Sequence, residues 1–274
     1  LINVFVNFFI GISLGSNVLA ARFFAAGKDK EMSETVHTAI TLALISGVGM
    51  GIIGVLAAKG ALMLMDTPDN VLNLSTLYMR IYFVGMPFFM LYNYGAAILR
   101  AVGDTKRPLL FLIISGLINA ALNMLLVIYC HMAVEGVAIA TVISNILSAS
   151  LVIHCLHHRR DEFQFRFHDM RIKWTDLKKI LIIGIPAGIQ GAIFSISNVF
   201  IQSGINSFGE DAIAGSSLAL NFEYFTYDIA NAFAQAAVTF TSQNYGAGNF
   251  KRCRRIFWLC MLFGIGFTEI LSVV

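Results

Sequence analysis

The sequence is dominated by eight long runs that are almost free of Asp, Glu, Lys and Arg. An α-helix needs about 20 mostly apolar residues to cross a bilayer, and each run is close to this length or longer. The runs are continuous, whereas the strands of a membrane barrel alternate apolar and polar residues over about ten positions. The sequence therefore predicts an all-α integral membrane protein with about eight spans. The runs cover 1–21, 35–58, 74–99, 108–134, 136–158, 180–209, 212–241 and 256–274.

Composition supports a membrane location. Hydrophobic residues make up 57% of the 274 residues and charged residues 13%, whereas soluble domains carry about 25% charged residues. The four cysteines form no CxxC pair and lie at no zinc-ligand spacing from a histidine, so we interpret them as apolar filler and expect no metal site. We expect the lipid bilayer as a partner, no nucleic acid, and a monomer.

The basic residues gather in alternate loops. All but Lys59 and Arg80 of the 19 Lys and Arg residues follow the first, third, fifth or seventh run. Because cytoplasmic loops carry the excess of Lys and Arg, this face is predicted to be cytoplasmic in a multi-pass protein of the inner or plasma membrane. The loops concerned are 22–34, 100–107, 159–179 and 242–255.

Two of these loops resemble each other, with Gly27 aligned to Gly248 six runs later. Six is an even number, so the two copies share one orientation, as in a parallel repeat. Two six-span lobes would make twelve spans, of which this chain would hold the second to the ninth, truncated at both ends. We expect a first lobe at 1–158, a basic cytoplasmic linker at 159–179 and the start of a second lobe at 180–274.

Three motifs lie in or beside the runs, and they read LRAVGDTKRP at 99–108, GIPAG at 184–188 and QNYGAGN at 243–249. They resemble motifs of the multidrug and toxic compound extrusion (MATE) family. The resemblance covers essentially the whole chain. It implies two six-helix lobes around a cavity that opens alternately to each side. It also implies a secondary antiporter, not an enzyme, that exports small cationic organic compounds in exchange for sodium ions or protons and needs no cofactor.

The residues of these motifs fit turns and a hinge. Gly103 and Asp104 form a tight-turn signal, and Pro108 suits the first turn of the following helix. Pro186 lies inside a run, where it removes a backbone bond, so we expect a kink that is either a hinge or static. The residues interpreted as structural turns or hinge are Gly27, Arg100, Gly103, Asp104, Pro108, Pro186, Gln243, Gly246 and Gly248.

Carboxylates at membrane depth are the clearest functional candidates, because burying them there is costly. Glu223 and Asp228 lie near the middle of the seventh run. At about 100° per residue, Asp228 shares one face of a helix with three amides, Asn221, Asn231 and Gln235. Such a carboxylate can bind sodium, take a proton or pair with a cationic drug. The alternative is a structural pair, for instance with Arg80.

Further candidates carry less information. Arg80 lies either deep in the third run or near the outer interface, where it can snorkel. Gln190 and Asn198 lie on a neutral polar face of the sixth run, whereas some family members have a glutamate in this stretch. The aromatic residues of the sixth and seventh runs either line a drug cavity through cation–π contacts or pack against lipid and protein, and they are Phe194, Phe200, Phe222, Tyr224, Phe225 and Tyr227.

Two motifs suggestive of enzymes are rejected. The G-x-G-x-x-G at 49–54 and the G-x-S-x-G at 11–15 both fall within apolar helical runs, with no strand before them, so small residues for close helix packing are the better interpretation. A flippase for lipids or lipid-linked oligosaccharides remains the alternative function. It would need several cationic residues for pyrophosphate, and the spans offer only Arg80.

Overall fold

The computed structural model describes residues 2–64, 69–159, 161, 163–206, 208 and 210–273. These residues form long helices joined by short connections, and they include no strand. The elements are α1 (Ile2–Ala25), α2 (Asp29–Leu64), α3 (Asp69–Val84), α4 (Met86–Ala101), α5 (Lys106–Asn123), a π-helix (Met124–Tyr129), α6 (Val134–His157), a 3-10 turn (Phe167–Asp169), α7 (Trp174–Asn206), α8 (Glu210–Gly246) and α9 (Phe250–Val273).

The all-α membrane fold is confirmed, although the helices differ in how strongly their composition indicates a span. Within the described residues, five helices are long and apolar enough to cross a bilayer, or six when the bent pair α3 and α4 counts as one. Helices α8 and α9, of 37 and 24 residues, are long enough but fall outside this set. Polar side chains along α8 and the basic start of α9 account for this, and their crossing stays a prediction.

The third run, 74–99, falls in two helices and not in one. It lies in α3 and α4, which meet at a bend of 44° with Gly85 between them. Pro87 lies at the start of α4 and has no N–H to donate to the preceding turn, so the helix is interrupted there. By contrast, α7 runs without a break through Pro186, so the hinge at that position stays a prediction.

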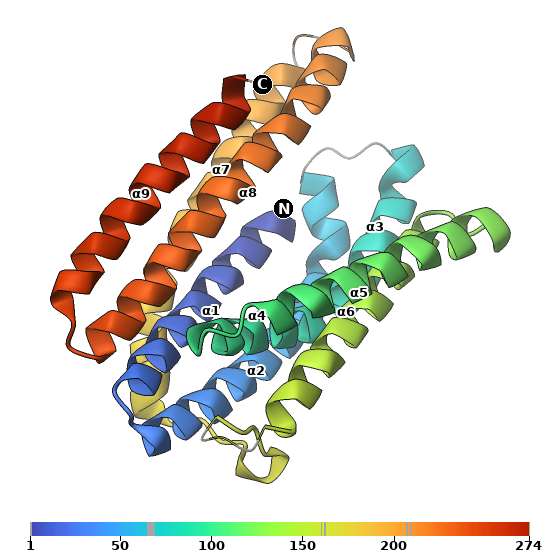
Figure 1. Ribbon diagram of the computed structural model, residues 1–274. Helices are drawn as coiled ribbons and strands as arrows, with labels where there is room; N and C mark the ends of the chain where they lie inside the picture. The colour runs from blue at the N-terminus through green and yellow to red at the C-terminus, as the bar shows by residue number, and fades with distance from the viewer. Residues whose placement is uncertain are drawn as a thin grey trace. The chain divides into compact units, whose positions relative to one another are not determined.

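The chain forms two compact units, and we describe each by itself. One contains residues 1–28 and 179–274, hence α1, most of α7, α8 and α9, and the other contains residues 29–178. Helices α8 and α9 run antiparallel side by side in the first unit, as α5 and α6 do in the second (Figure 1). Helix α1 therefore groups with α7–α9, whereas the predicted lobes 1–158 and 180–274 put it with α2–α6. As statements about the whole protein, those lobes remain predictions.

Glycines explain how α1 approaches α7. A Cβ added to Gly11 would lie 2.3 Å from the backbone nitrogen of Gly188, and one added to Gly15 would lie 2.2 Å from the carbonyl oxygen of Ile180. Such distances are too short for any side chain, so the two backbones are in direct contact. The G-x-S-x-G motif is thus a packing face. In α2, Gly54, the last glycine of the G-x-G-x-x-G motif, likewise faces the ring of Phe83.

Candidate functional site

The polar contacts of the first unit begin where α1 meets α7. The amide of Asn7 donates a hydrogen bond of 2.7 Å to the hydroxyl of Ser195. The single hydrogen of that hydroxyl has two carbonyl acceptors within reach, those of Gly191 at 3.0 Å and Asn3 at 3.4 Å. Ser195 is buried. The close approach allowed by the glycines therefore continues as a hydrogen-bonded contact toward the start of α1.

Helix α8 packs on α1 near the ends of both helices. Thr239 donates a hydrogen bond of 3.1 Å to Oδ1 of Asn17, and both side chains are buried. About two turns further along α8, a Cβ added to Gly246 would lie 2.3 Å from the carbonyl oxygen of Arg22, so the backbones touch. The guanidinium of Arg22 lies over the ring of Tyr245, 4.9 Å from its centroid, a distance typical of a cation–π contact.

The face of α8 that contacts α1 is the face that carries Asp228. Thr239, Ser242 and Gly246 follow Asp228, Asn231 and Gln235 at spacings of three or four residues, which keeps all six on one side of a helix. Thr239 and Ser242 are buried and Gln235 is half-buried, whereas Asp228 and Asn231 are exposed. On α8 this polar face continues from Asp228 to Gly246, and α1 covers it at one end only.

Glu223 lies on a different face from Asp228. They are five positions apart in the sequence, which places them about 140° apart around the helix. Both carboxylates are exposed, and within the described residues neither has a hydrogen-bond or ion-pair partner. The structure thus separates the two candidates and leaves Asp228 as the carboxylate of the stripe. The side chain of Asn221, also predicted for the stripe, lies outside the described residues.

The remaining span candidates occupy other surfaces. On α7, Gln190 is exposed and Asn198 is half-buried. Arg80 is exposed on α3, which belongs to the other compact unit, so its pairing with a span carboxylate stays a prediction. Of the aromatic residues, Phe194 and Tyr227 stack with ring centroids 5.0 Å apart and planes at 11°, and this stack joins α7 to α8 beside Asp228 in the sequence.

A groove of about 330 Å³ lies between α8 and α9, away from the stripe. Phe233 and Phe267 stack across the two helices with centroids 5.8 Å apart. The groove is lined almost entirely by apolar side chains, with Thr268 and Glu269 as its polar members. Glu269, whose depth the sequence does not reveal, therefore lies at a helix–helix groove and not on the polar face of α8.

The two glycine turns of the predicted repeat have the same hydrogen bonds. After α1, the N–H groups of residues 26, 27 and 28 donate to the carbonyl oxygens of residues 22, 24 and 23. After α8, the N–H groups of residues 247, 248 and 249 donate to those of 243, 245 and 244, each at the same offset of 221 residues. Gly27 and Gly248 have positive φ angles of 63° and 72°. Both turns therefore use the glycine-dependent Schellman cap.

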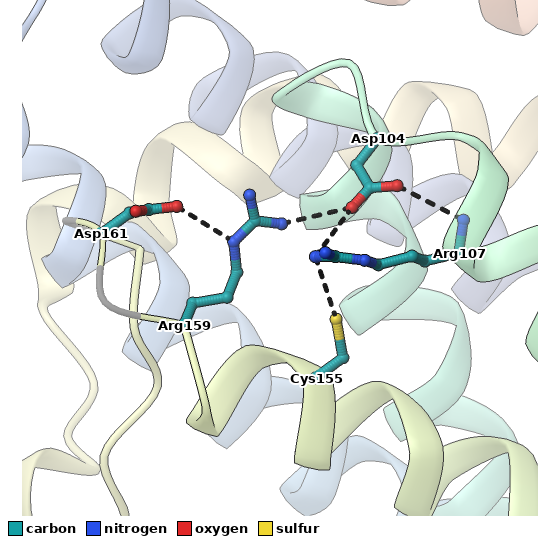
Figure 2. A network of polar contacts seen from close by, with 5 residues as sticks. All are labelled: Asp104, Arg107, Cys155, Arg159 and Asp161. Atoms are coloured by element: carbon teal, nitrogen blue, oxygen red, sulfur yellow. Dashed lines mark hydrogen bonds and ion pairs between the residues drawn. The ribbon is translucent and has the colours of Figure 1, made fainter.

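The turn after α4 is of the same kind and is pinned by ion pairs. Gly103 has φ 87°, and the N–H of Asp104 donates to the carbonyl oxygen of Leu99 at 2.9 Å. Figure 2 shows the carboxylate of Asp104 between two guanidinium groups, those of Arg107 and Arg159, each at 3.3 Å. Arg159 of the linker thus reaches the turn at Gly103 and Asp104, a contact that the motif does not predict.

Two further motif residues have structural contacts. Pro108 is buried in the first turn of α5, and its carbonyl oxygen accepts a hydrogen bond of 3.1 Å from the hydroxyl of Tyr92. Arg100 is half-buried in the last turn of α4, where a cation is favourable beside free carbonyl groups. Of the functional contacts, Asn17 and Thr239 were missed. The signal for Asn17 was an amide within the first apolar run, and the signal for Thr239 was the continuation of the stripe at helical spacing.

The chain matches a family of known proteins and is similar to individual transporters. The model of the MatE family matches residues 1–125 and 186–274. The chain is 31% identical over 270 residues to the probable multidrug resistance protein YoeA of Bacillus subtilis, covering 94% of this chain and 58% of that protein. It is 25% identical to the FAD transporter of Shewanella oneidensis, covering 96% and 59%. The chain thus spans less than two thirds of the length of these relatives.

Solved structures resemble the chain over nearly all of its length. A crystal structure of MATE in the straight conformation superimposes with a TM-score of 0.85 at 22% identity, covering 99% of this chain and 60% of that one. A MOP superfamily transporter from Pyrococcus furiosus gives a TM-score of 0.85 at 23% identity, with the same coverage. At these identities the likeness shows the fold alone, and that fold is the helical membrane transporter fold predicted from the sequence.

Proposed function

Because the chain belongs to the MatE family, whose members are membrane transporters and not enzymes, we propose that the whole protein exports small cationic organic compounds in exchange for sodium ions or protons. The proposal places it in the plasma membrane as a monomer. The loops 22–34, 100–107, 159–179 and 242–255 face the cytoplasm in this proposal, since they hold the basic residues.

The observation that carries the proposal is the polar face of α8. This face is covered by α1 at Thr239 and Ser242 and continues, uncovered, to Asp228. A carboxylate on the open part of such a face is accessible to a cation that enters beside α1. Within a membrane a carboxylate without a partner is costly, so gaining a sodium ion, a proton or a cationic cargo there is favourable. Competition for Asp228 would then couple the cargo to the ion.

The charge of the surrounding helices favours cationic cargo. There is no Lys or Arg between Ile180 and Gly246, and in residues 1–28 the first basic residue is Arg22, at the end of α1. One relative is named an FAD transporter, and FAD carries a negatively charged pyrophosphate. An anionic cargo or a lipid-linked pyrophosphate would need cationic partners, and α7 and α8 supply none along this stretch. These residues therefore support the antiporter over a flippase.

Ethidium efflux from a pump-deficient bacterium that expresses the whole protein tests the proposal. We expect Asp228→Asn to reduce efflux at least about tenfold, because losing one charge-assisted contact costs about 1.5–3 kcal/mol. Glu223→Gln is the matched control on another face of the same helix and should reduce efflux much less. Replacing sodium with potassium in the assay distinguishes sodium from proton coupling. Wild-type efflux by Asp228→Asn, at equal protein levels, would reject Asp228 as the coupling carboxylate.

A further inference from the structure

His37, in the first turns of α2, is buried with both ring nitrogens bonded. Only 4% of the residue is exposed. Its Nδ1 lies 2.7 Å from the carbonyl oxygen of Ser33, and its Nε2 lies 3.1 Å from the backbone nitrogen of Arg166. A carbonyl oxygen only accepts and a backbone N–H only donates, so Nδ1 must carry a hydrogen and Nε2 must not. The two bonds therefore fix a neutral histidine in one tautomer.

The bond to Arg166 attaches the linker to α2. Two linker aromatic residues, Phe163 and Phe165, are buried, and the rings of Phe165 and His37 lie 5.5 Å apart. Further along, the backbone N–H of Lys173 donates to Oγ1 of Thr38 at 3.1 Å. The basic linker thus contacts α2 at Phe165, Arg166, Arg171 and Lys173, and we call residues 163–173 the linker strap.

Ion pairs also join the strap to α2. The ammonium of Lys173 pairs with Glu34, and the guanidinium of Arg171 lies 3.6 Å from the same carboxylate. The bond to Glu34 raises the pKa of Lys173, so this amine stays protonated throughout the range in which histidine titrates. Since Glu34 already faces two cations, it offers little compensation to a third positive charge at His37. The ion pairs of Glu34 with Lys173 and Arg171 are therefore expected to stay formed when His37 gains a proton.

We infer that His37 makes the attachment of the linker strap sensitive to pH. Protonation of Nε2 would set two N–H donors, those of His37 and Arg166, against each other and would place a positive charge in a buried site. Attachment is then retained at alkaline pH and weakened as the pH falls through the range in which histidine gains its proton. The titratable and charged groups around this site are Lys30, Glu31 and Glu34 on α2, Arg166, Arg171 and Lys173 on the strap, His157 on α6 and Asp176 at the start of α7.

His157 provides a matched control on the other side of the strap. Its Nδ1 lies 2.9 Å from the carbonyl oxygen of Phe165, so this nitrogen donates. Protonation of His157 would occur at Nε2 and would leave that donation intact. Both histidines thus bind the strap, His157 through a nitrogen that donates and His37 through a nitrogen that accepts. Only the bond of His37 requires a neutral ring.

Hydrogen exchange of the purified chain in detergent, followed by mass spectrometry at pH 8 and pH 5.5 and corrected for intrinsic exchange, tests the inference. In the wild type we expect protection of peptides covering 163–173 to fall about tenfold at the lower pH, because a buried hydrogen bond is replaced by a repulsion between two N–H donors. A peptide from the middle of α6 should not change. His37→Gln, which keeps an amide acceptor but does not titrate, should abolish the pH dependence, and His157→Gln should retain it.

Two outcomes would overturn the inference. One is equal strap protection at both pH values in the wild type, a result that does not depend on whether any variant folds. The other is a His37→Gln variant whose strap loses protection at pH 5.5 as the wild type does. Because the measurement follows the linker alone, neither outcome depends on transport, and the inference stands or falls separately from the proposed antiport.

Discussion

Thr239 of α8 donates a hydrogen bond of 3.1 Å to Oδ1 of Asn17 in α1, across 222 residues of sequence. These two helices end in the matching turns at Gly27 and Gly248, whose hydrogen bonds agree one for one. The bond therefore joins the equivalent helices of the predicted repeat, and it lies where the polar face of α8 passes from its covered to its open part.

Replacing Thr239 by Val should destabilise the first unit by about 1–3 kcal/mol, because the shape is kept while a buried donor is lost. Thr239→Ser keeps the hydroxyl and is the control, with a smaller loss. Thermal unfolding in detergent, followed by size-exclusion chromatography after heating, provides the measurement. If Val and Ser variants melt together, the hydroxyl does not contribute to holding α1 against α8.

The glycine contact between α1 and α7 predicts a second pair of variants. Gly11→Ala should be strongly destabilising, because the added Cβ would lie 2.3 Å from the backbone of Gly188 and the helices would have to separate. Gly266→Ala, on α9, has nothing within 4 Å of its added Cβ. Alanine is the better helix former by about 1 kcal/mol, so that control should be neutral or stabilising. The same melting assay distinguishes them, and equal losses would argue against the contact.

Hydropathy and helical spacing predicted the features that depend on one helix at a time. The spans follow from uninterrupted apolar runs, and the stripe through Asp228 follows from spacings of three and four residues. The turns at Gly27, Gly103 and Gly248 follow from local chemistry, because a glycine after a helix favours a positive φ. For these features the determining interactions lie within a few residues of sequence.

Features that depend on a distant partner were missed. The burial of Phe165 requires His37, more than a hundred residues earlier, and in the sequence Phe165 reads as one aromatic residue in a polar loop. The grouping of α1 with α7 requires Gly11 to meet Gly188, although each alone is an ordinary small residue in a span. The bend at Gly85 is a different case, since Pro87 signals it and the continuous apolar run concealed it.

The ion pairs of Asp104 predict unequal contributions from its two arginines (Figure 2). The side chain of Arg159 is 18% exposed and bridges Asp104 and Asp161, both at 3.3 Å, whereas that of Arg107 is 54% exposed. Exposed pairs contribute about 0–1 kcal/mol and are screened by salt. Arg159→Gln should therefore lower the melting temperature of the second unit more than Arg107→Gln, and high salt should reduce both effects. A larger loss for Arg107→Gln would contradict the assignment.

The repeat itself predicts that Gly27 and Gly248 respond alike. Each has a positive φ and open space around an added Cβ, so Ala should cost about 1–2 kcal/mol from backbone strain alone. Asn tolerates the left-handed region better than Ala, and Gly27→Asn and Gly248→Asn should therefore lose less. Melting temperatures of the four variants measure both comparisons. The two turns have the same three hydrogen bonds, so the difference in stability between the Ala and Asn variants should agree at the two sites. A disagreement of more than about 1 kcal/mol would mean that one turn is held by contacts that the other lacks.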